Sequence, residues 1–231
     1  MPKPPLATLL DAVLFDLDGV IVDTAHLHFL AWRHVAEKNG LTLSKAQNES
    51  LKGLSRMDSL KMIYTLHGLP LPDASTLEAM ATEKNHWYVD ALKTLSAKDI
   101  LPGVLNLLET LRTHHIKTAV ASSSKNAKTI LAHIGLQDAF DTIVDGWSIE
   151  KSKPDPEVFL KAAERLHARP EHTLVIEDAL SGIQAARAAG MCVLGVGSHE
   201  QLGVADAVVL SLNAFHLEDF VQRFCPNKGE R

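Results

Sequence analysis

Two pairs of carboxylates each follow a short apolar run in the sequence. Asp16 and Asp18 come directly after the run Ala12–Phe15. Glu177 and Asp178 come directly after a later run. Carboxylates gathered at one place raise one another's pKa unless a cation neutralises them, and an oxygen-only ligand set suits Mg²⁺. These residues are therefore candidate ligands of a magnesium ion.

Asp16 and Asp18 also have the spacing of a nucleophile and a proton carrier. Side chains two residues apart return to the same side of an extended chain. One carboxylate can attack phosphorus and form an aspartyl phosphate, while the other transfers the proton of a leaving or attacking oxygen. Gly19, which follows directly, permits a tight turn that brings the backbone close to a phosphate.

A second group of residues suits the binding of an anion. Hydroxyl groups, backbone N–H groups and a lysine at the start of a helix bind phosphate. In SKPDPEVF, Asp155 is expected to cap a helix and Pro156 to be its first residue, which holds Lys153 within reach of a phosphate. The other residues of this group follow an apolar run; they are Ser122, Ser123, Ser124, Lys125 and Asn126.

Each of these residues has a simpler interpretation when it is taken alone. Asp and Glu after strands often cap helices or stabilise turns, and a lysine in a polar loop is usually solvated. The chemical interpretation depends on their convergence at one edge of a single sheet. The chain must therefore contain elements that bring them there.

Short runs rich in Val, Ile and Leu predict buried strands, and helical patterns separate the later ones. This alternation predicts an α/β fold with a Rossmann-like parallel sheet, in which ligands bind beyond the carboxyl ends of the strands. The expected strands are Ala12–Phe15, Lys117–Ala121, Thr142–Val144, Leu174–Ile176, Val193–Val196 and Ala207–Leu210. The expected helices are Val104–Thr113, Asn126–His133, Pro156–Leu166 and Leu180–Ala189.

The interval between the first two strands is far longer than one crossover needs. It contains helical patterns that end at Gly40 and Gly68, both expected at helix C-termini, and a third pattern within residues 73–95. We therefore expect a helical cap domain over residues 24–95, inserted into a core domain formed by residues 1–23 and 96–231. A terminal helix is expected within residues 212–231.

Composition limits the partners and the cellular setting. The 231 residues carry a formal net charge of −5, so the sequence lacks the excess of basic residues that is typical of nucleic-acid-binding proteins. Cys192 and Cys225 lack metal-ligand or CxxC spacing, which fits a reducing compartment. No apolar run has the length of a membrane span or a signal peptide. We expect a cytoplasmic protein without a nucleic-acid or membrane partner, and a monomer because the sequence shows no interface signal.

The order FDLDGV, then a Ser/Lys segment, then SKPDP, then IED resembles the motifs of the haloacid dehalogenase-like (HAD) superfamily, and so does the position of the insert. The resemblance implies that Asp16 is the nucleophile and Asp18 the general acid/base. It also implies that Ser122 and Lys153 hold the transferring phosphoryl group. The implied Mg²⁺ site consists of Asp16, the Asp18 backbone carbonyl, Glu177 and Asp178.

Further segments, among them NESLKGLSRMDSL, EKNHWYV and IEDALSGIQAA, resemble the β-phosphoglucomutase branch of that superfamily. This resemblance implies that Thr24 and His28 couple Asp18 to closure of the cap. It assigns the phosphate that is not transferred to Arg56, with residues 124–126 on the same phosphate or on the sugar. The other residues that it places at the sugar or phosphate are Trp32, Lys52, Gly53, Leu54, Ser55, Lys84, Asn85 and Ser123.

Several cap residues also fit ordinary packing. His28 on an apolar helix could be a core histidine, and Trp32 follows it at helical packing spacing. Arg56 could be an exposed charge near the start of a helix. Ser50 stands where some relatives carry Gln, at the edge of the loop that would select the sugar.

By this resemblance the chain is expected to interconvert β-glucose 1-phosphate and glucose 6-phosphate through β-glucose 1,6-bisphosphate. Mg²⁺ would be the cofactor and the bisphosphate the primer. A sugar-phosphate phosphatase with the same core is the first alternative, and a second phosphate site at Arg56 and Lys125 would argue against it. A non-catalytic binding protein is the second alternative, and the presence of Asp16, Asp18 and Lys153 argues against it.

Overall fold

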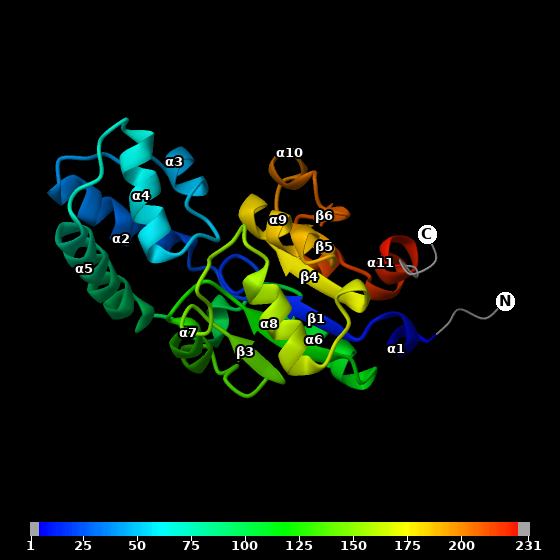
Figure 1. Ribbon diagram of the computed structural model, residues 1–231. Helices are drawn as coiled ribbons and strands as arrows, with labels where there is room; N and C mark the ends of the chain where they lie inside the picture. The colour runs from blue at the N-terminus through cyan, green and yellow to red at the C-terminus, as the bar shows by residue number, and fades with distance from the viewer. Residues whose placement is uncertain (1–4, 226–231) are drawn as a thin grey trace.

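A six-stranded parallel sheet forms the centre of the molecule, as seen in a computed structural model that describes residues 5–225 (Figure 1). The strand order is β3-β2-β1-β4-β5-β6, so the order reverses at β1. The strands are β1 Ala12–Phe15, β2 Lys117–Ala121, β3 Thr142–Val144, β4 Thr173–Glu177, β5 Cys192–Val196 and β6 Ala207–Val209. Ligands bind at such a reversal, beyond the carboxyl ends of the strands.

Helices cover both faces of the sheet because successive side chains of each strand point to opposite faces. Val13 and Phe15 of β1 join one buried apolar cluster, while Ala12 and Leu14 join the other. The first cluster includes side chains of α1 Leu6–Leu9, α6 Val104–Thr113, α7 Ala127–His133 and α11 Leu217–Phe224. The second includes side chains of α8 Glu157–Leu166, α9 Leu180–Ala188 and α10 His199–Leu202.

A separate group of helices lies between β1 and β2 in the chain and forms the lobe on the left in Figure 1. Its helices are α2 Ala25–Lys38, α3 Lys45–Glu49, α4 Arg56–Leu66 and α5 Ala74–Leu92. They enclose an apolar cluster of their own. The apolar clusters of this lobe and of the sheet are not fully separate, because Tyr88, Leu92 and Leu95 of the lobe pack into the cluster of the sheet. Below, the cap means residues 24–95 and the core the remaining described residues.

The predicted elements agree with the structure to within a residue or two at their ends. Three strands have the predicted bounds and the others differ by one residue. Gly40 and Gly68 follow α2 and α4 with positive φ, as expected. The prediction for the helix after Lys153 was wrong by one residue: Pro156 is the N-cap and α8 begins at Glu157. Asp155 still accepts a hydrogen bond from the Glu157 N–H.

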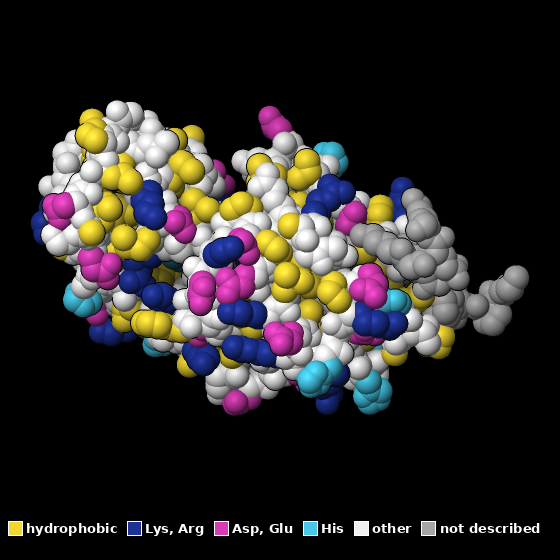
Figure 2. Space-filling model, in the orientation of Figure 1, with side chains coloured by type: hydrophobic (Ala, Val, Ile, Leu, Met, Phe, Trp, Pro, Cys, Tyr) yellow, Lys and Arg dark blue, Asp and Glu magenta, His cyan; other side chains and the backbone are white. Residues whose placement is uncertain are grey.

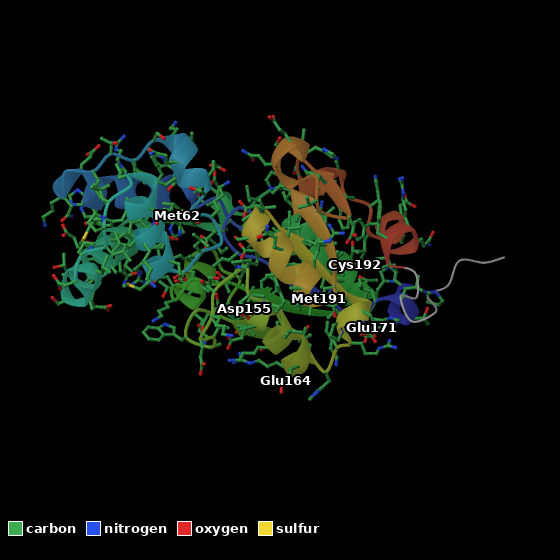
Figure 3. The ribbon with its side chains drawn as sticks, turned by 45° about the horizontal axis from the view of Figure 1, so that its top comes forward. Met62, Asp155, Glu164, Glu171, Met191 and Cys192 are labelled. Atoms are coloured by element: carbon green, nitrogen blue, oxygen red, sulfur yellow. The ribbon has the colours of Figure 1, made fainter. Side chains whose placement is uncertain are left out.

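Other elements were not anticipated. The short helices α1, α3 and α10 lack the length at which a 3.6-residue period becomes visible in a sequence. The expected terminal helix is α11, and the rest of that expectation, residues 226–231, lies outside the described residues. Figure 3 labels Met62 on α4 in the cap, and Met191 and Cys192 at the start of β5 in the core. Among the described residues, none of the helices is long and apolar enough to cross a membrane.

Candidate active site

The carboxyl ends of β1, β2 and β4 bring the predicted polar residues together around one lysine. The ammonium of Lys153 lies 2.5 Å from Asp16 Oδ1 and 2.5 Å from Glu177 Oε1. It also donates to the carbonyl oxygen of Ala121, at the end of β2, at 3.2 Å. Lys153 is only 1% exposed, so these contacts replace its hydration. Lys153, for which a solvated loop position was the simpler alternative, is thus buried among the carboxylates of the site.

Electrostatics explain why the lysine stays charged in this position. Burial lowers the pKa of Lys153, but the carboxylates of Asp16 and Glu177 outweigh it and hold the pKa above its ordinary value. Burial raises the pKa of Asp16, and Glu177 and Asp178 add to this while Lys153 opposes it. One ammonium therefore does not neutralise all of the carboxylates gathered here.

Asp178 is a buried carboxylate that its one cationic neighbour, Lys52, does not fully neutralise. Burial, and then the charge of Glu177, raise its pKa to about 7, although Lys52 lies 3.3 Å away. Its carboxylate lies directly against the loop after β1: a Cβ at Gly19, where φ is +84°, would overlap it. Asp178 therefore adjoins the turn that follows Asp16 and Asp18, as an oxygen-donor site for a hard cation requires.

The hydrogen-bond partners of the carboxylate oxygens indicate which residues could bind Mg²⁺. Both oxygens of Glu177 have partners, Oε1 in Lys153 and Oε2 in the Ala179 N–H at 2.8 Å. Its position suits it to hold Lys153, and its role as a Mg²⁺ ligand stays a prediction. Among the described residues, His, Cys, Asp and Glu side chains do not form a metal-binding group of three or more. Two carboxylates, a backbone carbonyl, waters and a phosphate are what Mg²⁺ commonly uses, so the residues present fit that ion.

Asp18 is linked to the cap by a chain of polar contacts. Thr24 Oγ1 donates a hydrogen bond to Asp18 Oδ1, and His28 Nε2 lies 3.7 Å from the same oxygen. His28 Nδ1 in turn lies 2.9 Å from the ammonium nitrogen of Lys84 on α5. Burial would raise the pKa of Asp18, but His28 and Thr24 outweigh it and lower the pKa. Asp18 is therefore ionised at neutral pH and can accept a proton.

Lys84 is a buried cation of the cap. Its ammonium lies 5.0 Å from the ring centroid of Trp32 and 4.2 Å from that of Tyr88. Burial, and then the charge of Arg56, lower its pKa to about 7. Aromatic faces stabilise a cation without neutralising it, which explains how the site tolerates this lysine.

Arg56 faces the core from the first turn of α4. Its guanidinium donates to Asn85 Oδ1 at 2.7 Å, and the Asn126 side chain donates to the same oxygen at 3.0 Å. Asn85 therefore connects Arg56 of the cap with the anion loop of the core, which we define as residues 122–126. Ser123 Oγ in this loop is buried and has no hydrogen-bond partner among the described residues, so it is available to a ligand.

A cavity of about 470 Å³ lies between cap and core. Figure 2 shows the two lobes, with the cap at the left. Of the residues predicted for the site, Thr24, Asn85, Lys153 and Glu177 lie outside the cavity lining, and all of these except Asn85 are buried. Those that line it are Asp16, Asp18, His28, Trp32, Lys52, Gly53, Leu54, Ser55, Arg56, Lys84, Ser122, Ser123, Ser124, Lys125, Asn126 and Asp178.

Several other lining residues were not predicted, and two of them, Ser152 and Asp58, make a contact between core and cap. Ser152 Oγ donates to Asp58 Oδ2 at 2.6 Å, and Ser55 Oγ donates to the same oxygen at 2.6 Å. Ser152 stands directly before Lys153 in the sequence, so it is adjacent to a residue that was predicted for the site. Nothing in the linear pattern, however, indicates that its hydroxyl faces the cap.

Comparisons with known proteins show the family to which the chain is similar. The family model for haloacid dehalogenase-like hydrolases matches residues 13–196. The chain is 43% identical to a β-phosphoglucomutase of Bacillus subtilis, over 90% of this chain and 92% of that protein. It is also 33% identical to a phosphorylated carbohydrates phosphatase of Thermotoga maritima, over 79% of this chain and 82% of that one. The β-phosphoglucomutase structure from Clostridium difficile superposes with a TM-score of 0.88 at 41% identity, covering 92% of this chain and 96% of that one.

Proposed function

The chain belongs to the haloacid dehalogenase-like hydrolases, and from this premise we propose that it is a phosphomutase with β-phosphoglucomutase activity. It would interconvert β-glucose 1-phosphate and glucose 6-phosphate through β-glucose 1,6-bisphosphate. The similarity to β-phosphoglucomutases of two organisms, at 41–43% identity over most of the chain, supports this activity over that of the more distant phosphatase.

The observation that carries the proposal is a single cavity with cationic groups from two directions. Asp16 and Asp178 line it on the core side, with Lys153 behind Asp16. Arg56 of the cap and Lys125 of the core also line it. A guanidinium and an ammonium suit a second phosphate that is not being transferred. A bisphosphate intermediate needs two such sites, whereas hydrolysis of a monophosphate needs one.

In the proposed reaction, Asp16 carries the phosphoryl group. A sugar hydroxyl attacks phosphorus, the bond between phosphorus and the Asp16 oxygen breaks, and Asp18 accepts the hydroxyl proton. The bisphosphate then turns over within the cavity. In the return step the Asp16 carboxylate attacks the other phosphate, and Asp18 gives its proton to the leaving oxygen. Asp16 is then phosphorylated again and Asp18 is again a carboxylate.

The residues around Asp16 would stabilise the transferring group. Lys153 would shift its contacts from Asp16 towards the phosphoryl oxygens, with Glu177 holding its ammonium in place. Ser122 and Ser123 would donate hydroxyl hydrogen bonds. Asp16, the Asp18 carbonyl and Asp178 would hold Mg²⁺, which supplies positive charge to the transferring phosphoryl group.

The cap would exclude water, because hydrolysis of the aspartyl phosphate would make the enzyme a phosphatase. Its contacts with the core support this role. Ser152 is bonded to Asp58 across the cavity, and Ser181 Oγ donates to the Lys52 carbonyl at 3.0 Å. His28 and Thr24 would couple cap closure to Asp18, since they join it to α2 and α5 through Lys84.

The test is conversion of β-glucose 1-phosphate to glucose 6-phosphate with Mg²⁺ and a trace of bisphosphate, with free phosphate followed in parallel. Isomerisation with little phosphate release is the expected result. Stoichiometric phosphate release without isomerisation would replace the mutase by a sugar-phosphate phosphatase. The cytoplasmic location and the monomeric state remain predictions, which cell fractionation and sedimentation would test.

A further inference from the structure

Trp147 is the most exposed aromatic side chain recorded near the cavity, and the expectations from sequence gave it no role. It is 73% exposed, so core packing does not explain its position. The residue lies in the loop after β3, which we define as residues 145–148. This loop lies beside the anion loop, because β3 is the parallel neighbour of β2.

The two loops are held together by backbone contacts. The Gly146 N–H donates to the Ser124 carbonyl at 3.1 Å. The approach is too close for a side chain, since a Cβ at Gly146 would overlap the Ser123 carbonyl oxygen. Asp145 Oδ1 accepts from the Trp147 N–H at 3.1 Å, which orders the start of the turn. The indole therefore extends from a constrained backbone.

Trp147 contacts Lys125 in two ways. Its indole N–H donates to the Lys125 carbonyl oxygen at 3.1 Å. Its ring lies beneath the Lys125 ammonium, with the nitrogen 4.3 Å from the ring centroid. The first contact fixes the Lys125 backbone and the second restricts its side chain. Lys125 lines the cavity, whereas Trp147 lies outside the lining.

The partner that positions Lys125 is uncharged. Among residues 5–225, the Lys125 ammonium has no carboxylate within ion-pair distance. A carboxylate would hold the side chain but would also cancel the charge that an anionic ligand needs. The face of an indole attracts a cation through its quadrupole and leaves that charge intact. It contacts one side of the ammonium, so the N–H groups on the other side remain available.

We propose that Trp147 is a positioning residue for substrate, which acts through Lys125 on the phosphate that is not transferred. The inference rests on the proposed function for the nature of that ligand. Trp147 reduces the number of rotamers that Lys125 must lose when the phosphate binds, and it does so without a countercharge beside the ammonium. Its effect belongs to binding, because neither contact reaches Asp16 or Asp18.

The test compares the full-length wild type with Trp147→Ala, Trp147→Phe, Lys125→Met and the double variant Trp147→Ala/Lys125→Met. Glucose 6-phosphate binding is measured by calorimetry and isomerisation by steady-state kinetics. Trp147→Ala should raise Kd and KM about three- to tenfold with kcat nearly unchanged, and Trp147→Phe, which keeps a ring, should lie between it and the wild type. In the Lys125→Met background, Trp147→Ala should have a much smaller effect, because only the bond from the indole N–H to the backbone carbonyl of residue 125 is then lost. Trp87→Ala, at an indole 46% exposed on the cap, is the matched control and should change neither constant.

The outcomes separate this inference from the proposed function. A wild type that isomerises, with Kd and KM unchanged by Trp147→Ala, would overturn the role of Trp147 alone. An equal loss on Trp147→Ala with and without Lys125 would also overturn it, since the effect would then bypass the lysine. A wild type that binds glucose 6-phosphate without isomerising, but binds it more weakly after Trp147→Ala, would overturn the mutase and support the role of Trp147. No binding by the wild type would overturn both.

Discussion

Ser152 Oγ and Asp58 Oδ2 lie 2.6 Å apart, and they belong to opposite walls of the cavity. Ser152 precedes the lysine that holds Asp16, and Asp58 stands two residues after Arg56 in the cap. Asp58 also accepts from Ser55, so a single carboxylate oxygen joins the cap loop to the core. Burial would raise the pKa of Asp58, but the hydrogen bonds from Ser152 and Ser55 outweigh it and lower the pKa. The contact is therefore made to a charged acceptor.

Ser152→Ala should shift the cap towards an open state. The lost hydrogen bond contributes roughly 1 kcal/mol, so the open-to-closed ratio should rise about fivefold. The measurement is the ratio of phosphate released to glucose 6-phosphate formed, which should increase because water enters the open site. Ser148→Ala removes a hydroxyl that donates to Asp145 within the core, at 3.1 Å, and is the control. An equal ratio in wild type and Ser152→Ala would show that this contact does not govern water exclusion.

Asp16→Ala should abolish turnover and leave the fold intact, because the site has one residue in the position of the nucleophile. Mass spectrometry after incubation with β-glucose 1,6-bisphosphate should show a phosphoryl adduct on the wild type and none on the variant. Asp16→Asn keeps the shape of the side chain and serves as a second variant if the alanine protein is unstable. Detection of covalent phosphate on either variant would move the nucleophile elsewhere.

Arg56→Ala should weaken isomerisation far more than the hydrolysis of an aryl phosphate. The guanidinium would bind only the second phosphate, which the aryl substrate lacks, so kcat/KM for β-glucose 1-phosphate should fall about 30-fold or more. Arg33→Ala is the control, since Arg33 lies on the outer part of α2 and pairs with Glu37 at 3.4 Å. Similar losses with both substrates would show that Arg56 is not specific to the second phosphate.

Mg²⁺ should stabilise the folded protein through Asp178. Because the ion would bind only the folded state, a concentration five times Kd should add about 1 kcal/mol to the free energy of unfolding. Thermal denaturation with and without Mg²⁺ measures this, and Asp178→Ala should lose most of the shift. Asp206→Ala, at a carboxylate that accepts from the Val193 N–H outside the cavity, should retain the shift. Retention by Asp178→Ala would place the ion elsewhere.

Lys84 should make stability depend on pH above neutrality. Its pKa in the folded protein is about 7, against an ordinary value of 10.5 that applies to the unfolded chain. Below pH 7 both states hold the proton, and the folded state has the full cost of a buried charge. Between these values only the unfolded chain retains the proton, so the free energy of unfolding rises with pH by about 1.4 kcal/mol per unit from this group.

Urea denaturation of the wild type and of Lys84→Met at about pH 7.5 and 9.5 tests this prediction by comparing pH slopes. The wild type should gain more stability than Lys84→Met on raising the pH. Lys93→Met, at an exposed lysine that pairs with Asp90, should follow the wild type. If the free energy of unfolding changed equally with pH in the wild type and in Lys84→Met, Lys84 would remain protonated at pH 9.5 in the folded state.

Local pattern was sufficient to predict the elements of the core and the order of its motifs. The runs around Val13, Val120 and Val175 are apolar because their strands are buried on both faces. Such a continuous apolar run can be recognised in the sequence itself. The polar residues after β1, β2 and β4 could be assigned to one edge because parallel strands place their carboxyl ends together. The sequence alone thus determined the sheet, the insertion of a helical cap and the chemical type of the site.

Tertiary structure decided which of these polar residues contact one another. Lys153 and Asp16 are separated by 137 positions and Ser152 and Asp58 by 94, and no period in the sequence relates them. The same holds for Lys125 and Trp147, whose contact depends on how closely two loops approach. Side-chain contacts across loops depend on the three-dimensional path of the whole chain, whereas the apolar pattern that signals a buried strand lies in the strand's own residues. The contacts of Glu177 with Lys153, and of Trp147 with Lys125, therefore emerged only from the folded structure.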